Sequence, residues 1–186
     1  MLNSGFTVLE LIAVIAIISI LTLIGISGFR ENTREVDKDR AVNGILLSLR
    51  EVQVLATTAR EFPTGSGEFD NGFGLFIEKD ATEYILFGDT NTNDEYDQSF
   101  NCSFDDSGEC IEERIIEASF SIDEICVGSN CGYDKLHVLF RRPSLGPVIT
   151  ADGNSGLNEV VVKITNSQGS GKELLISSTG KMYVVE

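Results

Sequence analysis

The order of apolar and polar positions divides the chain into three stretches. Residues 11–29, LIAVIAIISILTLIGISGF, contain no charged residue and no proline. Residues 30–61 place apolar side chains at intervals of three and four, and short segments after residue 62 alternate apolar with polar positions. These periods predict an apolar helix, an amphipathic helix and a set of β-strands.

The helical stretch is expected to run from residue 6 to 61 and to end before Pro63. Seven apolar residues form one stripe that should pack on the globular domain: Val42, Ile45, Leu46, Leu49, Val52, Ala56 and Ala59. Leu47 and Val54 lie off this stripe. Two interpretations stay open: these residues contact other molecules of an assembly, or they are simply partly exposed apolar residues, which are common.

Eight segments with a period of two are candidate strands: Gly74–Glu78, Glu83–Phe87, Arg114–Ala118, Ile122–Val127, Leu136–Arg141, Glu159–Thr165, Glu173–Ser177 and Lys181–Val185. We therefore expect an α+β fold. In it a long N-terminal α-helix, transmembrane in its first half and amphipathic in its second, packs on an antiparallel β-sheet domain.

Glu10 stands at the head of the apolar run, whose length is close to the roughly 20 residues that a membrane-spanning helix needs. A carboxylate at the centre of a bilayer costs about 2.5–3.5 kcal/mol, and less near an end. A residue carried at that cost usually has a partner. The alternative is that Glu10 lies at the interface and stays hydrated.

The string Gly5-Phe6-Thr7-Val8-Leu9-Glu10 before an apolar run resembles the processing signal of type IV prepilins and pseudopilins. The resemblance implies that a prepilin peptidase cuts between Gly5 and Phe6 and that Phe6 is then N-methylated. It also implies that Glu10 faces the terminal amine of a neighbouring subunit during assembly. Two such charges are expensive in lipid and neutralise each other only when subunits dock in one register.

The C-terminal half resembles the GspH/FimT group of pseudopilins and minor pilins, in Leu136–Phe140, Val160–Ile164 and Glu173–Lys181. The resemblance implies a leader at 1–5, a transmembrane and assembly helix at 6–29, an amphipathic helix at 30–61 and an extracytoplasmic β-rich domain at 62–186. The chain would then be a single-pass inner-membrane protein that enters a type IV pilus or type II secretion filament. Its partners would be other subunits, the prepilin peptidase and the inner-membrane assembly platform.

Two alternative functions are a DNA-uptake minor pilin and a membrane-anchored binding domain that never polymerises. Charge bears on the first of them. The net charge is −15 and the pI about 4.4. Such a surface repels phosphate backbones, so nucleic acid is not an expected partner. His137 is the only histidine and lies in a strand pattern with no paired nucleophile nearby in the sequence, so we expect a protein that is not an enzyme.

Oxygen side chains alternate in the segment Asp89–Asp97. Asp89, Asn91, Asn93 and Asp97 resemble the first half of a calcium-binding loop, although the sixth position is Asp94 rather than glycine. Calcium is therefore a candidate ligand. A polar turn between two strands explains the same residues.

All four cysteines follow residue 100: Cys102, Cys110, Cys126 and Cys131. An even number of cysteines in two short-spaced pairs is typical of disulfides formed in an oxidising compartment. Short loops favour pairing Cys102 with Cys110 and Cys126 with Cys131. A four-cysteine zinc site is the alternative, but its spacing would be unusually wide.

Overall fold

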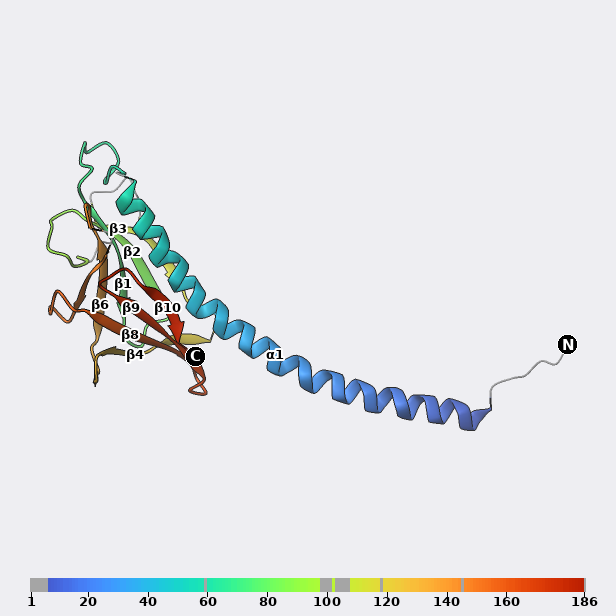
Figure 1. Ribbon diagram of the computed structural model, residues 1–186. Helices are drawn as coiled ribbons and strands as arrows, with labels where there is room; N and C mark the ends of the chain where they lie inside the picture. Colours follow the sequence, from blue (N-terminus) through green and yellow to red (C-terminus); the bar gives the residue numbers. More distant parts are fainter. Residues whose placement is uncertain are drawn as a thin grey trace. The chain divides into compact units, whose positions relative to one another are not determined.

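The computed structural model describes residues 7–58, 60–97, 102, 108–117, 119–144 and 146–185, without the side chains of residues 24–34. The chain forms two compact units, Met1–Asp37 and Lys38–Glu186. One helix, α1 (Val8–Thr57), contributes residues to both units, so each part of it is described with its own unit (Figure 1).

In the second unit α1 buries one stripe of side chains, spaced as a helix requires. Val42, Ile45, Leu49 and Val52 are no more than 1% exposed. This part of the predicted stripe is confirmed. The helix ends at Thr57, before the segment that contains Pro63, whose ring and missing N–H are incompatible with a helix interior.

The first sheet has five antiparallel strands in the order β3-β2-β1-β6-β7. Its strands are β1 (Gly72–Glu78), β2 (Glu83–Asp89), β3 (Cys110–Ile115), β6 (Lys135–Phe140) and β7 (Val148–Ala151). The central pair joins β1 to β6, which are far apart in the sequence, with Phe76 opposite His137.

The second sheet also has five antiparallel strands, in the order β10-β9-β8-β4-β5. Its strands are β4 (Phe120–Val127), β5 (Asn130–Cys131), β8 (Glu159–Asn166), β9 (Gly171–Ser177) and β10 (Met182–Val185). Their core-facing residues alternate with more exposed ones, as a sheet with one buried face requires.

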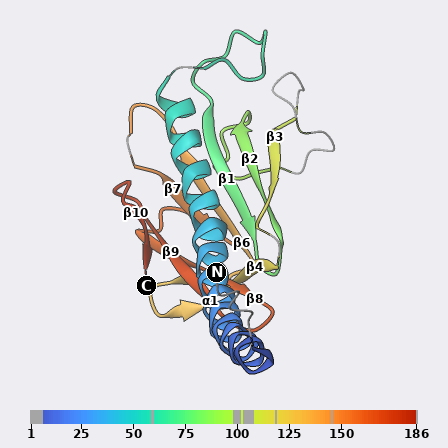
Figure 2. The ribbon, with the colours of Figure 1, turned by 90° about the vertical axis from the view of Figure 1, so that its right-hand side faces the viewer.

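One hydrophobic core joins the helix to both sheets. It contains Leu49 of α1, Leu75 and Val138 of the first sheet, and Val162 and Ile176 of the second, all fully buried. Figure 2 shows α1 passing across the strands that supply these residues. Full burial of such a side chain stabilises the fold by about 1.5–3 kcal/mol, so this shared core holds the three elements together.

The first sheet also buries side chains on its other face. There Phe76, Phe87, Tyr96 and Leu139 form a second, smaller cluster with Cys110. Burial on both faces explains why β1 is apolar at consecutive positions rather than at alternate ones.

Polar contacts tie α1 to the first sheet at one point. The Arg114 guanidinium of β3 donates to Ser48 Oγ at 2.8 Å and pairs with Glu51 at 2.7 Å, both on the helix. Ser48 Oγ also lies 3.0 Å from the Tyr84 hydroxyl of β2. The buried Ser48 hydroxyl is therefore satisfied, and the helix is fixed in register on the sheet.

The expected fold class is wrong. Two five-stranded sheets stand where one antiparallel sheet was expected, so the protein is mostly β. Alternation in a sequence shows which side chains share a face, but not which strands pair, and the ten strands divide between two sheets. In the described part of the chain no helix is long and apolar enough to span a membrane.

Candidate functional site: the N-terminal helix segment and the Asp89–Asp97 loop

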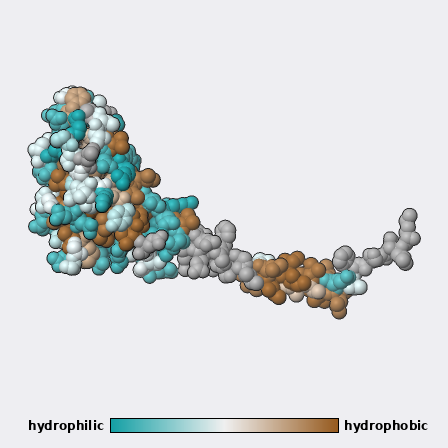
Figure 3. Space-filling model, in the orientation of Figure 1, coloured by the Kyte–Doolittle hydropathy of each residue, from teal (hydrophilic) through white to brown (hydrophobic). Residues whose placement is uncertain are grey.

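Apolar side chains of α1 are exposed from Val8 to Leu23, which we call the N-terminal segment. Leu9 is 78% exposed, Ile12 63%, Ile17 58% and Leu21 63%. Figure 3 shows this segment as a largely hydrophobic surface. Every residue from Thr7 to Leu23 is exposed, so the apolar side chains of this segment cover all sides of the helix.

Thr7 and Glu10 form a capping box at the N-terminal end of this segment. The Thr7 N–H and the Thr7 hydroxyl each lie 3.1 Å from Glu10 Oε2, and the Glu10 N–H donates to Thr7 Oγ1 at 3.2 Å. This reciprocal pair satisfies N–H groups that the first helical turn leaves without partners. The pattern Thr-x-x-Glu was visible in the sequence, and our sequence interpretation missed it.

Gly5 and Phe6, the predicted processing residues, lie outside the described residues. Thr7, the first described residue, follows Phe6 directly. The predicted cleavage and methylation therefore remain predictions, and the structure adds only that the helix begins within two residues of Phe6.

The structure brings together all four residues of the predicted calcium loop. The loop follows β2 and begins at Asp89, whose side chain is fully buried. The Asp89 carboxylate accepts hydrogen bonds from the N–H groups of Asn93 and Asp94, at 3.2 and 3.1 Å. The Arg141 guanidinium also pairs with Asp89, and it lies 3.0 Å from the Asp94 carboxylate.

This arrangement does not fit calcium. The side-chain oxygens of Asn91 and Asn93 accept backbone N–H groups two residues further on, and their amide nitrogens both donate to Asp97 Oδ2. Calcium requires six to eight oxygens directed at one point. Here the oxygens are directed at N–H donors, and the positive charge beside Asp89 is that of Arg141.

Two further residues hold the loop, and sequence interpretation did not assign either one to it. Glu109 is 4% exposed, and its carboxylate accepts from the Thr90 N–H, the Thr90 hydroxyl and the Asp97 N–H, at 3.1, 3.2 and 2.7 Å. Burial raises the pKa of Glu109, and the donors at Asp97 and Thr90 oppose that rise. Buried carboxylates of this kind need such donors.

His137 is the second of these residues. Its Nδ1 accepts the Tyr96 N–H at 2.8 Å, and its ring lies 4.9 Å from that of Phe76. Burial, with a smaller contribution from Lys135, lowers the pKa of His137 from 6.5 to about 4. The imidazole is therefore neutral at pH 7, and it acts as an acceptor that anchors the loop on the outer face of the first sheet.

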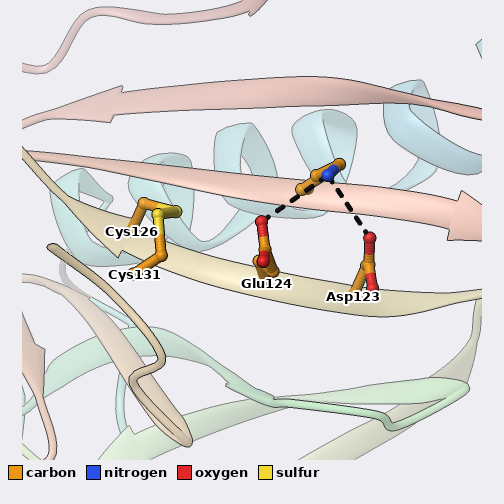
Figure 4. Close-up of a disulfide and its surroundings, with 5 residues drawn as sticks. Asp123, Glu124, Cys126 and Cys131 are labelled. Carbon is orange, nitrogen blue, oxygen red and sulfur yellow. Dashed lines mark ion pairs between the residues drawn. A yellow bond between two sulfur atoms is a disulfide. The ribbon is translucent and has the colours of Figure 1, made fainter. Parts of the chain in front are cut away.

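Both predicted disulfides are confirmed: Cys102 pairs with Cys110, and Cys126 with Cys131. The second joins directly opposed residues of β4 and β5 (Figure 4). Glu124 lies near this pair and bonds to Lys163. Because the two sulfurs are bonded to each other, neither is a thiolate, and this cluster is not a metal site.

Comparison with known proteins identifies no relative. The chain matches no family model, and no curated protein and no solved structure matches it. The N-terminal segment, the disulfides and the Asp89–Asp97 loop are therefore the features that bear on function.

Proposed function

We propose that this chain is a structural subunit, a minor pilin or pseudopilin, of a type IV pilus or type II secretion filament. A prepilin peptidase at the inner membrane cleaves it between Gly5 and Phe6, and Phe6 is then N-methylated. The N-terminal segment packs among the same segments of other copies. The second unit, Lys38–Glu186, which we call the globular unit, lies outside the cytoplasm and performs no catalysis.

The exposure of the N-terminal segment is the observation that carries this proposal. Eleven large apolar residues between Val8 and Leu23 are at least 47% exposed. Burying one leucine or isoleucine side chain against a partner contributes about 1.5–3 kcal/mol to the free energy of association. A helix that is apolar on all sides is stable only when it is surrounded. A bundle of several copies supplies such surroundings, whereas one flat partner would cover only one side.

The two disulfides support the location. Disulfides form and persist in oxidising compartments such as the periplasm, and they are rare in the cytosol. The globular unit contains both disulfides, and the described residues include no free cysteine.

The basic residues do not favour the alternative of DNA binding. Arg141 pairs with Asp89 and Asp94, and Arg142 pairs with Asp70 and donates to the Phe69 carbonyl. Their charges are thus balanced within the unit, and phosphate contacts would have to displace these partners.

The capping box leaves two roles open for Glu10, and a pair of variants separates them. Glu10→Gln keeps an oxygen that can accept from Thr7 but removes the charge. Thr7→Ala removes the capping hydroxyl but keeps the charge. The measurement is the amount of each variant in filaments sheared from cells that carry the assembly machinery, together with the mass of the mature N-terminus.

If the Glu10 charge neutralises the terminal amine of a neighbouring copy, Glu10→Gln is lost from filaments and Thr7→Ala enters them. The mature wild-type chain then begins with N-methylated Phe6. The proposal is contradicted if the wild-type chain keeps residues 1–5. It is also contradicted if Glu10→Gln enters filaments as well as the wild type does, because Glu10 would then act only as a cap.

A further inference from the structure

The loop that follows α1 borders a pocket that the proposed function does not use. Figure 2 shows this loop, in teal, projecting beyond the end of the helix. The pocket has a volume of about 420 Å³ and is lined by residues 67–71 of the loop and by Thr90 and Thr92. This volume lies in the range of small-molecule binding sites. We call it the Phe69 pocket.

The loop is held in one conformation by its own contacts. Phe62 is fully buried against Gly88, where an added Cβ would lie 2.3 Å from the Phe62 ring. The Phe62 N–H donates to the Glu68 carbonyl at 3.1 Å, and the Asn71 amide donates to the Phe62 carbonyl at 2.6 Å and to Glu68 Oε2 at 3.2 Å. A preformed loop of this kind loses little conformational entropy when a ligand binds.

Phe69 lies in the same loop as Phe62, but its ring is not covered. It is 50% exposed, whereas Phe62 is 0% exposed. The Arg142 guanidinium donates to the Phe69 carbonyl at 2.5 Å and pairs with the Asp70 carboxylate at 3.5 Å. The backbone of Phe69 is therefore fixed while its ring stays half exposed. A ring presented in this way offers a large apolar contact area to a ligand.

Three oxygen atoms of the residues that line the pocket have no hydrogen-bond partner in the described part of the chain. They are Glu68 Oε1, Asn71 Oδ1 and the Thr92 hydroxyl. The neighbouring donors are already used, because both Asn71 amide hydrogens are donated within the loop and the Thr90 hydroxyl donates to Glu109. The side chains of the pocket therefore offer mainly acceptors.

The backbone at Thr92 is strained. Its φ is 64°, in the left-handed region that a β-branched residue rarely adopts. Strained residues of this kind cluster at ligand-binding and active sites. Thr92 lines the Phe69 pocket, so the strain supports a binding role for this part of the loop.

The lining disfavours three classes of ligand. Glu68 and Asp70, within a chain of net charge −15, repel anions. A purely apolar ligand would bury the free oxygens without partners, which is unfavourable. A cation gains little, because the Asp70 carboxylate already pairs with Arg142 and the Glu68 carboxylate already accepts from Asn71.

We propose that the Phe69 pocket binds a neutral saccharide. Sugar hydroxyls donate hydrogen bonds, so they supply the donors that Glu68 Oε1 and Asn71 Oδ1 lack, and they can accept from the Thr92 hydroxyl. One side of a sugar ring presents C–H groups, which pack on the electron-rich face of an aromatic ring such as that of Phe69. A ligand rich in hydroxyls and with one apolar face therefore matches both the free oxygens and the exposed ring.

Saturation-transfer NMR on the full chain tests this proposal. The chain is kept in a detergent whose head group contains no sugar, and the probes are glucose, galactose, mannose and N-acetylglucosamine. A ligand of about a dozen non-hydrogen atoms in an open pocket binds with millimolar affinity, which this method detects. We expect saturation to reach the C–H protons of at least one of these sugars. Argininamide, added separately, is the cationic probe.

Two variants and one control locate the binding. Phe69→Ala removes the ring that packs on the sugar and should weaken binding about tenfold. Phe69→Tyr keeps a ring and should bind as the wild type does. Tyr183→Ala is the matched control, because Tyr183 is an aromatic residue that is 49% exposed on β10, outside the pocket. It should leave binding unchanged. An unchanged thermal unfolding midpoint shows that each variant is folded.

The proposal is refuted if none of the four sugars receives saturation, or if Phe69→Ala binds as tightly as the wild type. It is also refuted if Tyr183→Ala weakens binding as much as Phe69→Ala does. If argininamide binds through Phe69 and the sugars do not, the pocket is a cation site and the proposal is wrong.

This site is independent of the proposed function. It involves neither Glu10 nor the N-terminal segment, so a Glu10→Gln chain that stays out of filaments should still bind the sugar.

Discussion

Two parts of the same helix use similar side chains in opposite ways. Between Ala41 and Ala56, α1 buries one stripe against two sheets and exposes the rest. Between Val8 and Leu23 it exposes isoleucine, leucine and valine on every side. The buried stripe is covered by other parts of the same chain. The exposed side chains of the N-terminal segment can be covered only by other molecules. The comparison shows that the distribution of apolar residues around a helix, more than their number, determines which of them the chain can bury by itself.

The largest effect expected from this comparison comes from Leu49→Ala. Leu49 is fully buried, so the variant loses transfer energy and leaves a cavity, at a cost of about 2–5 kcal/mol. Leu47→Ala and Leu21→Ala, 69% and 63% exposed, should change the free energy of unfolding by less than about 0.5 kcal/mol. Denaturant unfolding of the full chain measures all three. Equal losses for Leu49 and Leu21 would mean that the two parts of the helix do not differ as described.

The pH dependence of stability tests the interior of the globular unit. The unfolded chain binds a proton at His137 below about pH 6.5, and the folded chain only near pH 4. Acidification through this window therefore favours unfolding, by about 3 kcal/mol. Glu109 acts in the opposite direction, because its raised folded-state pKa favours the folded state as it is protonated.

His137→Asn isolates this contribution, since its amide oxygen can accept the Tyr96 N–H without titrating. Unfolding midpoints between pH 7 and pH 4 should fall steeply in the wild type and much less in the variant. Parallel curves for the two proteins would assign the pH dependence to other groups.

A smaller loss is expected from Arg141→Gln. The change leaves the buried Asp89 carboxylate without its positive partner, at about 2 kcal/mol because Arg141 is partly exposed. The adjacent Arg142 pairs with the exposed Asp70, so Arg142→Gln should cost less than about 1 kcal/mol. Thermal unfolding compares them.

Calorimetric titration of the wild type with calcium should give no heat, and a binding isotherm would show that the loop rearranges around the ion.

The smallest effect is expected at the helix N-terminus. Thr7→Ala removes the capping hydroxyl and weakens the first turn by about 1 kcal/mol, whereas Thr7→Ser keeps it. Amide exchange at Leu9–Leu11 should accelerate in Thr7→Ala alone. Equal rates in both variants would show that the capping box contributes nothing to the first turn.

Helical periodicity predicted the buried stripe of α1 because the spacing of apolar residues directly encodes one face. Among the described residues, seven of the candidate strands correspond to observed strands with differences at their ends. The candidate Arg114–Ala118 overlaps β3 only at Arg114 and Ile115, so most of that strand was missed. Strands β5 and β7 were missed, since they have two and four residues and lie among turn-forming residues. Division into two sheets was missed because strand pairing depends on contacts that are distant in the sequence.

The loop shows the same limit at the level of single residues. Alternating oxygens in Asp89–Asp97 were visible in the sequence, but their partners were not. His137 belongs to β6, and Arg141 directly follows that strand. Glu109 immediately precedes β3. Only the fold brings them to the loop. Local patterns thus identified the polar segment but not the groups that hold it in place.

The most direct test of the account is to identify what covers the N-terminal segment in the native assembly. A photo-crosslinking residue at Ile17, which is 58% exposed, can be activated in cells that carry the assembly machinery. If the N-terminal segments pack together in a filament, we expect cross-links to residues 8–23 of other copies, identified by mass spectrometry. Cross-links to lipid alone, or to no other copy of the chain, would contradict it.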